Sequence, residues 1–357
     1  MSTSLVTGGC GFVGRHLINR LLKLGHDVWV VDDLSTGLHP DQWLEGVSRR
    51  TNGRVAHLSY RIGQQTVTFF QEDLLLTMLK QLKLIPDDNR VELPRFDYVF
   101  QLASVVGGRT KIDGDPMGVA IDLGIDSLFF LWMVRNPDKV GKVLYASSSA
   151  AYPINLQKKD GHVALREEMI DFTTGELGQP DMTYGWSKLT GEYLSHLAAR
   201  QYGIKICCVR PFSGYGEDQD LTYPVPAIAY RVARGDNPVT VWGTGEQGRD
   251  FVHVEDCITA MLHAVDRVHD GSAINIGTGR LTTFLEVAKL FVQLAGYKSE
   301  VQPKVGKPVG VQSRYCDPTR MQALLDWKPQ IPLEEGFGRV LQGAQARVQS
   351  LGRNAIE

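Results

Sequence analysis

The stretch Thr7-Gly8-Gly9-Cys10-Gly11-Phe12-Val13-Gly14 joins a short β-rich run, residues 4–7, to a helical pattern over residues 12–24. Its glycines at positions 8, 11 and 14 permit a tight turn, the close approach of a pyrophosphate, and close packing of the helix against the strand. The N-terminus of such a helix presents free N–H groups and the positive end of its dipole to phosphates. The stretch therefore predicts a strand–turn–helix unit that binds a dinucleotide.

The end of the second predicted strand indicates which dinucleotide is bound. Residues 27–31 form an apolar strand pattern, and Asp32 follows it, 24 positions after Gly8. A carboxylate at this place accepts hydrogen bonds from the adenosine ribose and repels a 2′-phosphate. Asp32 therefore favours NAD over NADP as the cofactor.

Alternation of β-rich runs and helical patterns through the first half of the chain predicts the fold. The further strand patterns cover residues 67–71, 98–102, 142–147 and 205–210, and the further helical patterns cover residues 74–82, 121–134 and 184–202. This order is typical of parallel strands with helices on both faces of one sheet. We predict an α/β fold, a Rossmann-type doubly wound parallel sheet, with the NAD-binding domain over residues 1–210.

The pattern of predicted strands and helices changes after residue 210. Pieces punctuated by glycine and proline, with isolated helical patterns, predict a smaller mixed α/β lobe that binds the substrate over residues 211–345. The two domains are expected to interleave, because late strands return to the large sheet from about residues 240–280. Residues 46–65, a long polar segment, are expected to be a surface insertion, and residues 158–182 a long loop.

The composition excludes several classes of protein. The 357 residues are 43% apolar and 22% charged with a net charge of −2, and without a strongly basic segment nucleic-acid binding is not expected. The longest apolar stretch, residues 127–134, is far shorter than the roughly 18 residues of a membrane span. Five scattered cysteines favour free thiols in a reducing cytoplasm, and nine histidines without metal-ligand spacing predict no metal.

A second chemical motif opens the last helical pattern of the first domain. Tyr184 and Lys188 are four positions apart and therefore share one face of a helix. An ammonium near the phenol, with the positive nicotinamide ring of the cofactor, favours the phenolate, so Tyr184 is suited to act as an acid/base. Serines 147–149 leave the fifth predicted strand at the edge where ligands of such folds gather.

These three features, in this order, resemble the extended short-chain dehydrogenase/reductase family, the nucleotide-sugar epimerases and dehydratases. The resemblance covers about residues 3–340. Further matching segments are residues 30–37, 72–74, 102–104, 242–256 and 325–329.

The resemblance implies a full set of site residues. The implied NAD contacts are Gly8, Gly11, Phe12, Val13, Gly14, Asp32, Asp33, Ser35, Thr36, Asp73, Leu74, Leu102, Ala103, Ser104, Tyr184, Lys188 and Pro211. The implied catalytic residues are Ser148, which hydrogen-bonds the reacting sugar oxygen, Tyr184 as the base and Lys188, which assists Tyr184 and holds the nicotinamide ribose. The implied substrate contacts are Ser149, Ser213, Arg249 and Arg314, with both arginines on the diphosphate.

Departures from single branches of the family narrow the reaction. The sugar 4,6-dehydratases have an Asp-Glu pair after the catalytic hydroxyl, where this chain has Ser149 and Ala150, and the UDP-glucuronate decarboxylases keep the glutamate. The GDP-mannose 3,5-epimerases and GDP-fucose synthases, which Tyr152 and Pro153 resemble, have a cysteine at the place of Ala150. Because neither Ser149 nor Ala150 ionises to move that proton, these activities are disfavoured.

Two further departures concern the contacts of the cofactor and substrate. Gln101 stands where the family often has histidine, and Ser213 replaces an asparagine that usually meets the nucleotide sugar. Both indicate contacts that differ from those of the best-known members.

By elimination, the sequence predicts an NAD-dependent nucleotide-sugar epimerase that acts at C4 through a transient 4-keto sugar, with Tyr184 as acid/base. A 3,5-epimerase, 4,6-dehydratase or C2-epimerase stays open if Glu167, Glu168 or Lys111 moves the additional proton. A 4-keto reductase stays open too, and a non-catalytic NAD-binding regulatory protein is the remote alternative. UDP is the commonest nucleotide in the family, whereas residues 310–314 favour GDP.

The resemblance also implies a homodimer. Leu123, Leu128, Leu131 and Val134 predict a helix that is apolar on a broad face. In the family this helix and the helix of the catalytic tyrosine often pair across a dimer.

Overall fold

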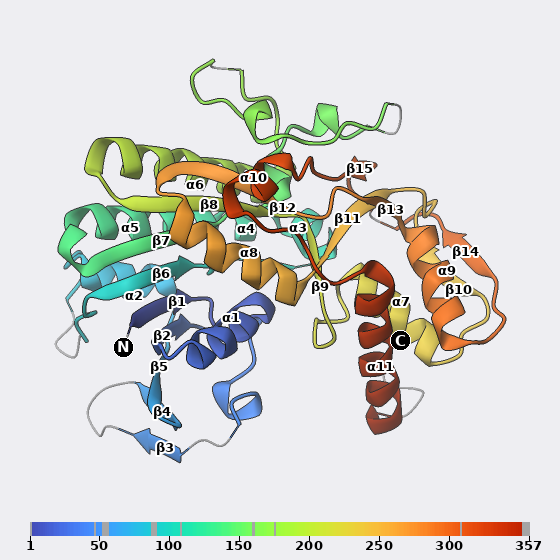
Figure 1. Cartoon of the computed structure of the whole chain (residues 1–357), viewed down its shortest axis with the longest axis horizontal. Coiled ribbons are helices and arrows are strands. Elements are labelled where there is room, and N and C mark those ends of the chain that lie inside the picture. Colours follow the sequence, from blue (N-terminus) through green and yellow to red (C-terminus); the bar gives the residue numbers. More distant parts are fainter. Residues whose placement is uncertain are drawn as a thin grey trace.

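One nine-stranded sheet forms the larger part of the molecule (Figure 1). The computed structural model describes residues 2–45, 48–51, 57–86, 91–107, 109–158, 161–174, 176–307 and 309–351. The strands of the sheet are β1 (Thr3–Thr7), β2 (Asp27–Asp32), β3 (Ser48–Thr51), β4 (Leu58–Ile62), β5 (Gln65–Gln71), β6 (Phe96–Gln101), β7 (Val140–Ala146), β8 (Lys205–Pro211) and β12 (Asp270–Ile276). Their spatial order is β12-β8-β7-β6-β1-β2-β5-β4-β3, and all pairs except the last two are parallel.

Helices cover both faces of this sheet. One face carries α1 (Phe12–Lys23), α8 (Val254–Arg267) and α10 (Thr319–Leu325), and the other carries α2 (Leu74–Gln81), α5 (Ile121–Arg135) and α6 (Met182–Tyr202). Two separate apolar cores result, because neighbouring strand residues point to opposite faces: Val6 packs in the first core and Leu5 in the second. The predicted doubly wound α/β fold is confirmed.

A smaller lobe lies beside the carboxyl edge of the sheet. Its strands are β9 (Ser213–Tyr215), β10 (Val239–Trp242), β11 (Gly248–His253), β13 (Leu281–Thr283), β14 (Val301–Lys304) and β15 (Ser313–Arg314), and its helices are α7 (Pro224–Ala233), α9 (Phe284–Ala295) and α11 (Leu333–Leu351). Phe291 and Phe337 stack at 4.8 Å in its core, with Phe251 against them. Between its segments, α8 and β12 return to the large sheet (Figure 1).

The remaining helices are short. They are α3 (Arg109–Gly114), α4 (Pro116–Val119) and the 3₁₀ turns η1 (Pro40–Gln42), η2 (Pro137–Lys139), η3 (Ser149–Ala151), η4 (Ile154–Leu156) and η5 (Glu167–Met169). Two of these turns, η3 and η4, follow β7 and carry the chain across the carboxyl edge of the sheet.

The expected insertion at residues 46–65 is more structured than the sequence indicated. Within it, β4 pairs antiparallel with β5, from Leu58 opposite Phe69 to Ile62 opposite Gln65, and β3 pairs with β4. Tyr60 is buried in the first core, whereas its neighbours Ser59 and Arg61 give the segment its polar composition. Residues 46, 47 and 52–56 of this segment lie outside the described part of the chain.

The predicted apolar helix, α5, also differs from expectation. Its most buried apolar side chains are Ile125, Phe129, Phe130, Trp132 and Met133, whereas Leu123 is exposed. Within the described residues, Pro116–Arg135 is long and apolar enough to cross a membrane by length and composition alone. The uninterrupted apolar run in this segment, residues 127–134, is much shorter and did not indicate this. The packing of α5 on the sheet, between α2 and α6, accounts for this composition.

Candidate active site

The glycine-rich turn lies at the carboxyl end of β1. Gly8 has a φ of +65°, and a Cβ there would lie 2.8 Å from the backbone of Ala103, which follows β6. A Cβ on Gly14 would lie 2.5 Å from the carbonyl oxygen of Gly8. Because these glycines carry no side chains, the backbone at the N-terminus of α1 leaves room for a dinucleotide pyrophosphate to approach closely. The residues present therefore fit NAD.

Asp32 is held at the end of β2 by the turn itself. Its Oδ2 accepts a hydrogen bond from the Cys10 N–H at 2.8 Å, and its Oδ1 accepts one from the Leu34 N–H at 2.8 Å. Burial raises the pKa of Asp32, and these two hydrogen bonds oppose that rise. A carboxylate offers about four acceptor positions, so Asp32 retains capacity for ribose hydroxyls.

The structure gathers most of the other predicted cofactor contacts at neighbouring strand ends. Phe12 and Val13 begin α1, and the exits of β1, β2 and β6 are adjacent because these strands pair in register. This brings Asp33, Ser35, Thr36, Leu102, Ala103 and Ser104 to one edge.

Some predicted contacts also have structural roles of their own. Asp73 caps α2 by accepting the Leu76 N–H at 2.9 Å, and Leu74 is buried in the second core. Pro211 ends β8, which is separated from β6 by β7.

Close packing brings the start of α6 against the turn that carries Ser148. A Cβ on Gly185 would lie 2.4 Å from the Ala150 carbonyl oxygen, and that oxygen accepts the Asp181 N–H at 3.0 Å. Ser148 caps η3, with its Oγ accepting the Ala150 N–H at 3.1 Å. The structure therefore brings the loop of Ser148 and the first turn of the Tyr184 helix together, as the sequence predicted.

Lys188 is buried next to Tyr184. Its Nζ lies 5.6 Å from the centre of the Tyr184 ring and 5.5 Å from that of Tyr145. Burial disfavours the ammonium, but the charges of Tyr184, Asp122 and Asp126 outweigh burial and raise the pKa of Lys188. Lys188 therefore keeps its positive charge next to the phenol.

Asp122 and Asp126 were missed by the sequence analysis. They lie one helical turn apart on the buried side of α5, and burial raises the pKa of Asp126 to about 6. Asp126 accepts hydrogen bonds from the Tyr145 hydroxyl at 2.6 Å and the Gln101 amide at 3.1 Å. Gln101, noted as a departure from the family, therefore links β6 to the carboxylates around Lys188.

Glu192 continues the same face of α6 one turn beyond Lys188. Its carboxylate accepts hydrogen bonds from Nε and Nη2 of Arg210, at 2.8 and 2.6 Å, and from the Ser147 hydroxyl. Each side chain of the ion pair is only 2% exposed. Arg210 further donates to the Tyr152 hydroxyl at 2.8 Å, which in turn donates to Asn275 on β12. This buried network connects the segment after β7, in which Ser147 precedes Ser148, with β8, β12 and α6.

The predicted substrate contacts lie on the smaller lobe and on the turn. Arg249 on β11 and Arg314 on β15 are register partners. Arg249 lies over the Phe284 ring, whereas Arg314 pairs with Asp181 at 2.7 Å. Ser213 on β9 pairs with β11, and Ser149 is buried in η3.

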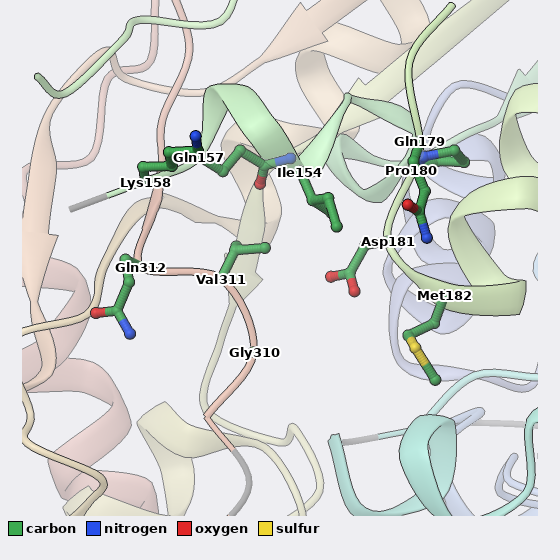
Figure 2. A pocket seen from close by; sticks show the side chains of 10 residues that line it. All are labelled: Ile154, Gln157, Lys158, Gln179, Pro180, Asp181, Met182, Gly310, Val311 and Gln312. Carbon is green, nitrogen blue, oxygen red and sulfur yellow. The ribbon is translucent and has the colours of Figure 1, made fainter. Parts of the chain in front are cut away.

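A cavity of about 630 Å³ lies between residues 310–312, which precede β15, and the start of α6 (Figure 2). Its walls are the segment after η3, the residues that lead into α6, and residues 310–312 before β15. The side chain of Asp181 points into its centre (Figure 2). The cavity therefore lies between the segment after η3, the start of α6 and the segment that leads into β15.

The side chains considered as additional proton donors have other partners or are exposed. The Glu167 carboxylate accepts the Asn275 N–H at 2.8 Å, and Glu168 forms an exposed ion pair with Arg166. Lys111 is exposed. Tyr223, which the sequence analysis missed, lies near Tyr184 at the start of α7, and burial first, then the charge of Tyr184, raises its pKa to about 12.

The profile of the NAD dependent epimerase/dehydratase family matches residues 4–277 of this chain. The chain belongs to this family, whose cofactor is NAD, and it is an enzyme of that class. The extended short-chain dehydrogenase/reductase resemblance in the sequence is thus confirmed.

Similar proteins carry several nucleotide-sugar activities. The chain is 27% identical to a Bacillus subtilis protein named an uncharacterized UDP-glucose epimerase, over 93% of this chain and 95% of that one. It is 29% identical to the CDP-paratose 2-epimerase of Salmonella typhi, over 94% and 97% of the two chains. Among solved structures, the UDP-glucose 4-epimerase of Thermotoga maritima with UDP-glucose has a TM-score of 0.76 and 26% identity, covering 97% and 99% of the two chains.

We expect Gly8→Ala to weaken NAD binding at least about tenfold, because a Cβ there would lie 2.8 Å from the backbone of Ala103 and would displace the turn that meets the pyrophosphate. Gly25→Ala is the matched control, since Gly25 has a φ of +84° with open space around it. The measurement is the NAD content of each purified protein after denaturation. Equal NAD content in the two variants would contradict close approach of the cofactor at Gly8.

Glu192→Gln should lower the free energy of unfolding by about 3 kcal/mol or more, because it leaves Arg210 buried without a counter-charge. Glu335→Gln removes one partner of an exposed pair with Arg339 and should cost less than about 1 kcal/mol. Urea unfolding of both variants followed by circular dichroism compares them. Similar midpoints for the two would show that the buried pair does not stabilise the fold.

Proposed function

We propose that this protein is a nucleotide-sugar epimerase that inverts C4 of the sugar without net oxidation. The observation that carries the proposal is the assembled set of Ser148, Tyr184 and Lys188 beside a turn whose next residues, Ser149 and Ala150, do not ionise. UDP-glucose epimerases among the similar proteins support a UDP-linked substrate, and the match of residues 310–314 to GDP-sugar enzymes keeps GDP as the alternative.

The chain's own groups would perform the proton transfers of this reaction. Tyr184, as a phenolate favoured by the charged Lys188, takes the proton of the C4 hydroxyl while Ser148 donates a hydrogen bond to the same oxygen. NAD, when bound, supplies the acceptor and later the donor of the C4 hydrogen. The 4-keto sugar then turns over in the site and Tyr184 returns the proton. Orientation of C4 contributes much of the rate enhancement.

A panel of UDP-, GDP-, dTDP- and CDP-sugars incubated in D₂O with the purified protein and no added NAD tests this proposal. We expect one substrate to give a product of unchanged mass, because the hydrogen at C4 never exchanges with solvent. Proton NMR then assigns the inverted carbon, which separates C4 from C2 epimerisation. Deuterium in the product, or loss of water or carbon dioxide, would contradict the proposal.

The variant Tyr184→Phe should abolish turnover in the same assay while NAD remains bound, and Tyr202→Phe at the exposed end of α6 should leave it unchanged. Activity of Tyr184→Phe close to that of the unmodified enzyme would refute the acid/base role.

We further propose that the enzyme is a homodimer formed through α4, α5 and α6. Met117, Ile121, Leu123 and Trp186 expose large apolar surfaces on these adjoining helices. An Ile121→Glu, Leu123→Glu double variant should halve the mass measured by light scattering, whereas Leu24→Glu, an exposed leucine just beyond α1, should not change it. A monomeric unmodified protein would disprove the dimer.

A further inference from the structure

Asp181 occupies the N-cap position of the catalytic helix but does not serve as a cap. An aspartate at this position commonly accepts a backbone N–H of the first helical turn. Within the described residues, the Asp181 side chain makes no such capping hydrogen bond to α6. Its Oδ2 instead accepts Nη2 of Arg314 at 2.7 Å, across 133 positions of sequence. The carboxylate therefore links the start of α6 to the smaller lobe rather than stabilising the helix locally.

Arg314 holds the other side of the catalytic turn as well. Its Nε donates to the Gln157 Oε1 at 2.5 Å, and the Gln157 amide donates to the carbonyl oxygens of Tyr152 and Pro153 at 3.0 and 3.1 Å. These carbonyls directly follow η3. One guanidinium on β15 thus reaches both the segment after Ser148 and the residue before the Tyr184 helix.

The two side chains of this ion pair are largely shielded from water. Their exposed fractions are 12% for Arg314 and 9% for Asp181, so the attraction is screened less than in a surface pair. Backbone hydrogen bonds from Gln312 and Ser313 to the Gln157 carbonyl hold β15 in place beside it.

The backbone between Asp181 and Tyr184 needs such support. Met182 has a φ of +57°, a left-handed conformation that side chains other than glycine disfavour. Such a residue persists where its surroundings fix it. Here the Asp181 N–H donates to the Ala150 carbonyl and its carboxylate pairs with Arg314. Both contacts fix the residue three positions before Tyr184.

We propose that Asp181 and Arg314 are positioning residues that couple the seating of the nucleotide sugar to the placement of Tyr184. The cavity between the lobes is lined by Asp181, Gln157 and residues 310–312, so a sugar bound there meets this ion pair (Figure 2). Arg314, expected from the resemblance to bind only the diphosphate, then also sets the start of the catalytic helix. The kinetic part of this proposal rests on the proposed epimerase function.

A double-mutant cycle separates this role from simple diphosphate binding. Asp181→Asn should lower kcat by about tenfold or more with KM changed far less, because misplacing a catalytic group costs rate. Arg314→Gln should lower kcat to the same extent and also raise KM, because it loses the diphosphate contact as well. The double variant should be no slower than the slower single variant, since both remove one interaction. Arg314→Lys, which keeps the charge, should recover part of kcat. Arg280→Gln, which breaks an exposed ion pair with Glu334, is the control and should match the unmodified enzyme.

Hydrogen exchange provides a readout that does not depend on turnover. The Gly185 N–H, bonded to the Asp181 carbonyl at 2.8 Å, and its neighbours in the first turn of α6 should exchange faster in Arg314→Gln but not in Arg280→Gln. Unchanged exchange in Arg314→Gln would overturn the proposal. A raised KM with unchanged kcat, together with an inert Asp181→Asn, would overturn it too. Failure of the unmodified enzyme to convert any nucleotide sugar would refute the epimerase proposal, and the exchange experiment would still decide the positioning role.

Discussion

The buried ion pair between Arg210 and Glu192 is the constraint on which the carboxyl edge of the sheet near Ser148 depends. Two charges sealed from water are tolerated only when each is fully paired, and this pair is bidentate and joined by Ser147 and Tyr152. Because its members come from the segment after β7, from β8 and from α6, satisfying the charges requires all three to meet in one arrangement. The turn of Ser148 lies directly above this arrangement. The same interaction that holds the fold together at this place therefore also fixes the geometry of the site.

Along one face of α6, every turn carries a polar or charged side chain: Tyr184, Lys188 and Glu192. These three side chains are buried to different extents. Tyr184 is partly exposed at the ligand edge, Lys188 is buried between aromatic rings and carboxylates, and Glu192 is committed to Arg210. The carboxylates on α5 keep Lys188 charged despite its burial. Gly191 lets this face approach the sheet closely, since a Cβ there would lie 2.0 Å from the Tyr145 hydroxyl, and Gly185 lets it approach the Ala150 carbonyl in η3. The surroundings of Tyr184 thus depend on buried groups that lie deeper along the helix.

Local patterns predicted the elements and the motifs, whereas the connections between distant side chains could not be predicted. The glycine turn, the strand exits and the spacing of Tyr184 and Lys188 are short-range features, and the structure places them as expected. Asp122 and Asp126 were not predicted as part of the site, because the helix that carries them is otherwise apolar. Their spacing of one helical turn does indicate that they share one face of that helix. The partners of Asp181 and Glu192 are set by how the lobes and strands pack, and nothing near these residues in the sequence indicates them. The strand β4 was not predicted for a similar reason. The segment that contains it is mostly polar, and the burial of Tyr60 depends on core residues that are distant in the sequence.

The burial of the turn after Ser148 limits what chemistry this edge supports. Elimination or inversion next to a keto group requires a second base that removes a proton from carbon, in addition to Tyr184. Ala150 and Ala151 are 3% and 0% exposed, so neither a side chain nor solvent at these positions provides one. Glu167 is held by β12, and Tyr223, with a pKa of about 12, is a neutral hydroxyl rather than a base at physiological pH. With Tyr184 as the proposed base, the described residues of this turn support the proposed reaction, which moves one hydroxyl proton and returns the same hydrogen to carbon.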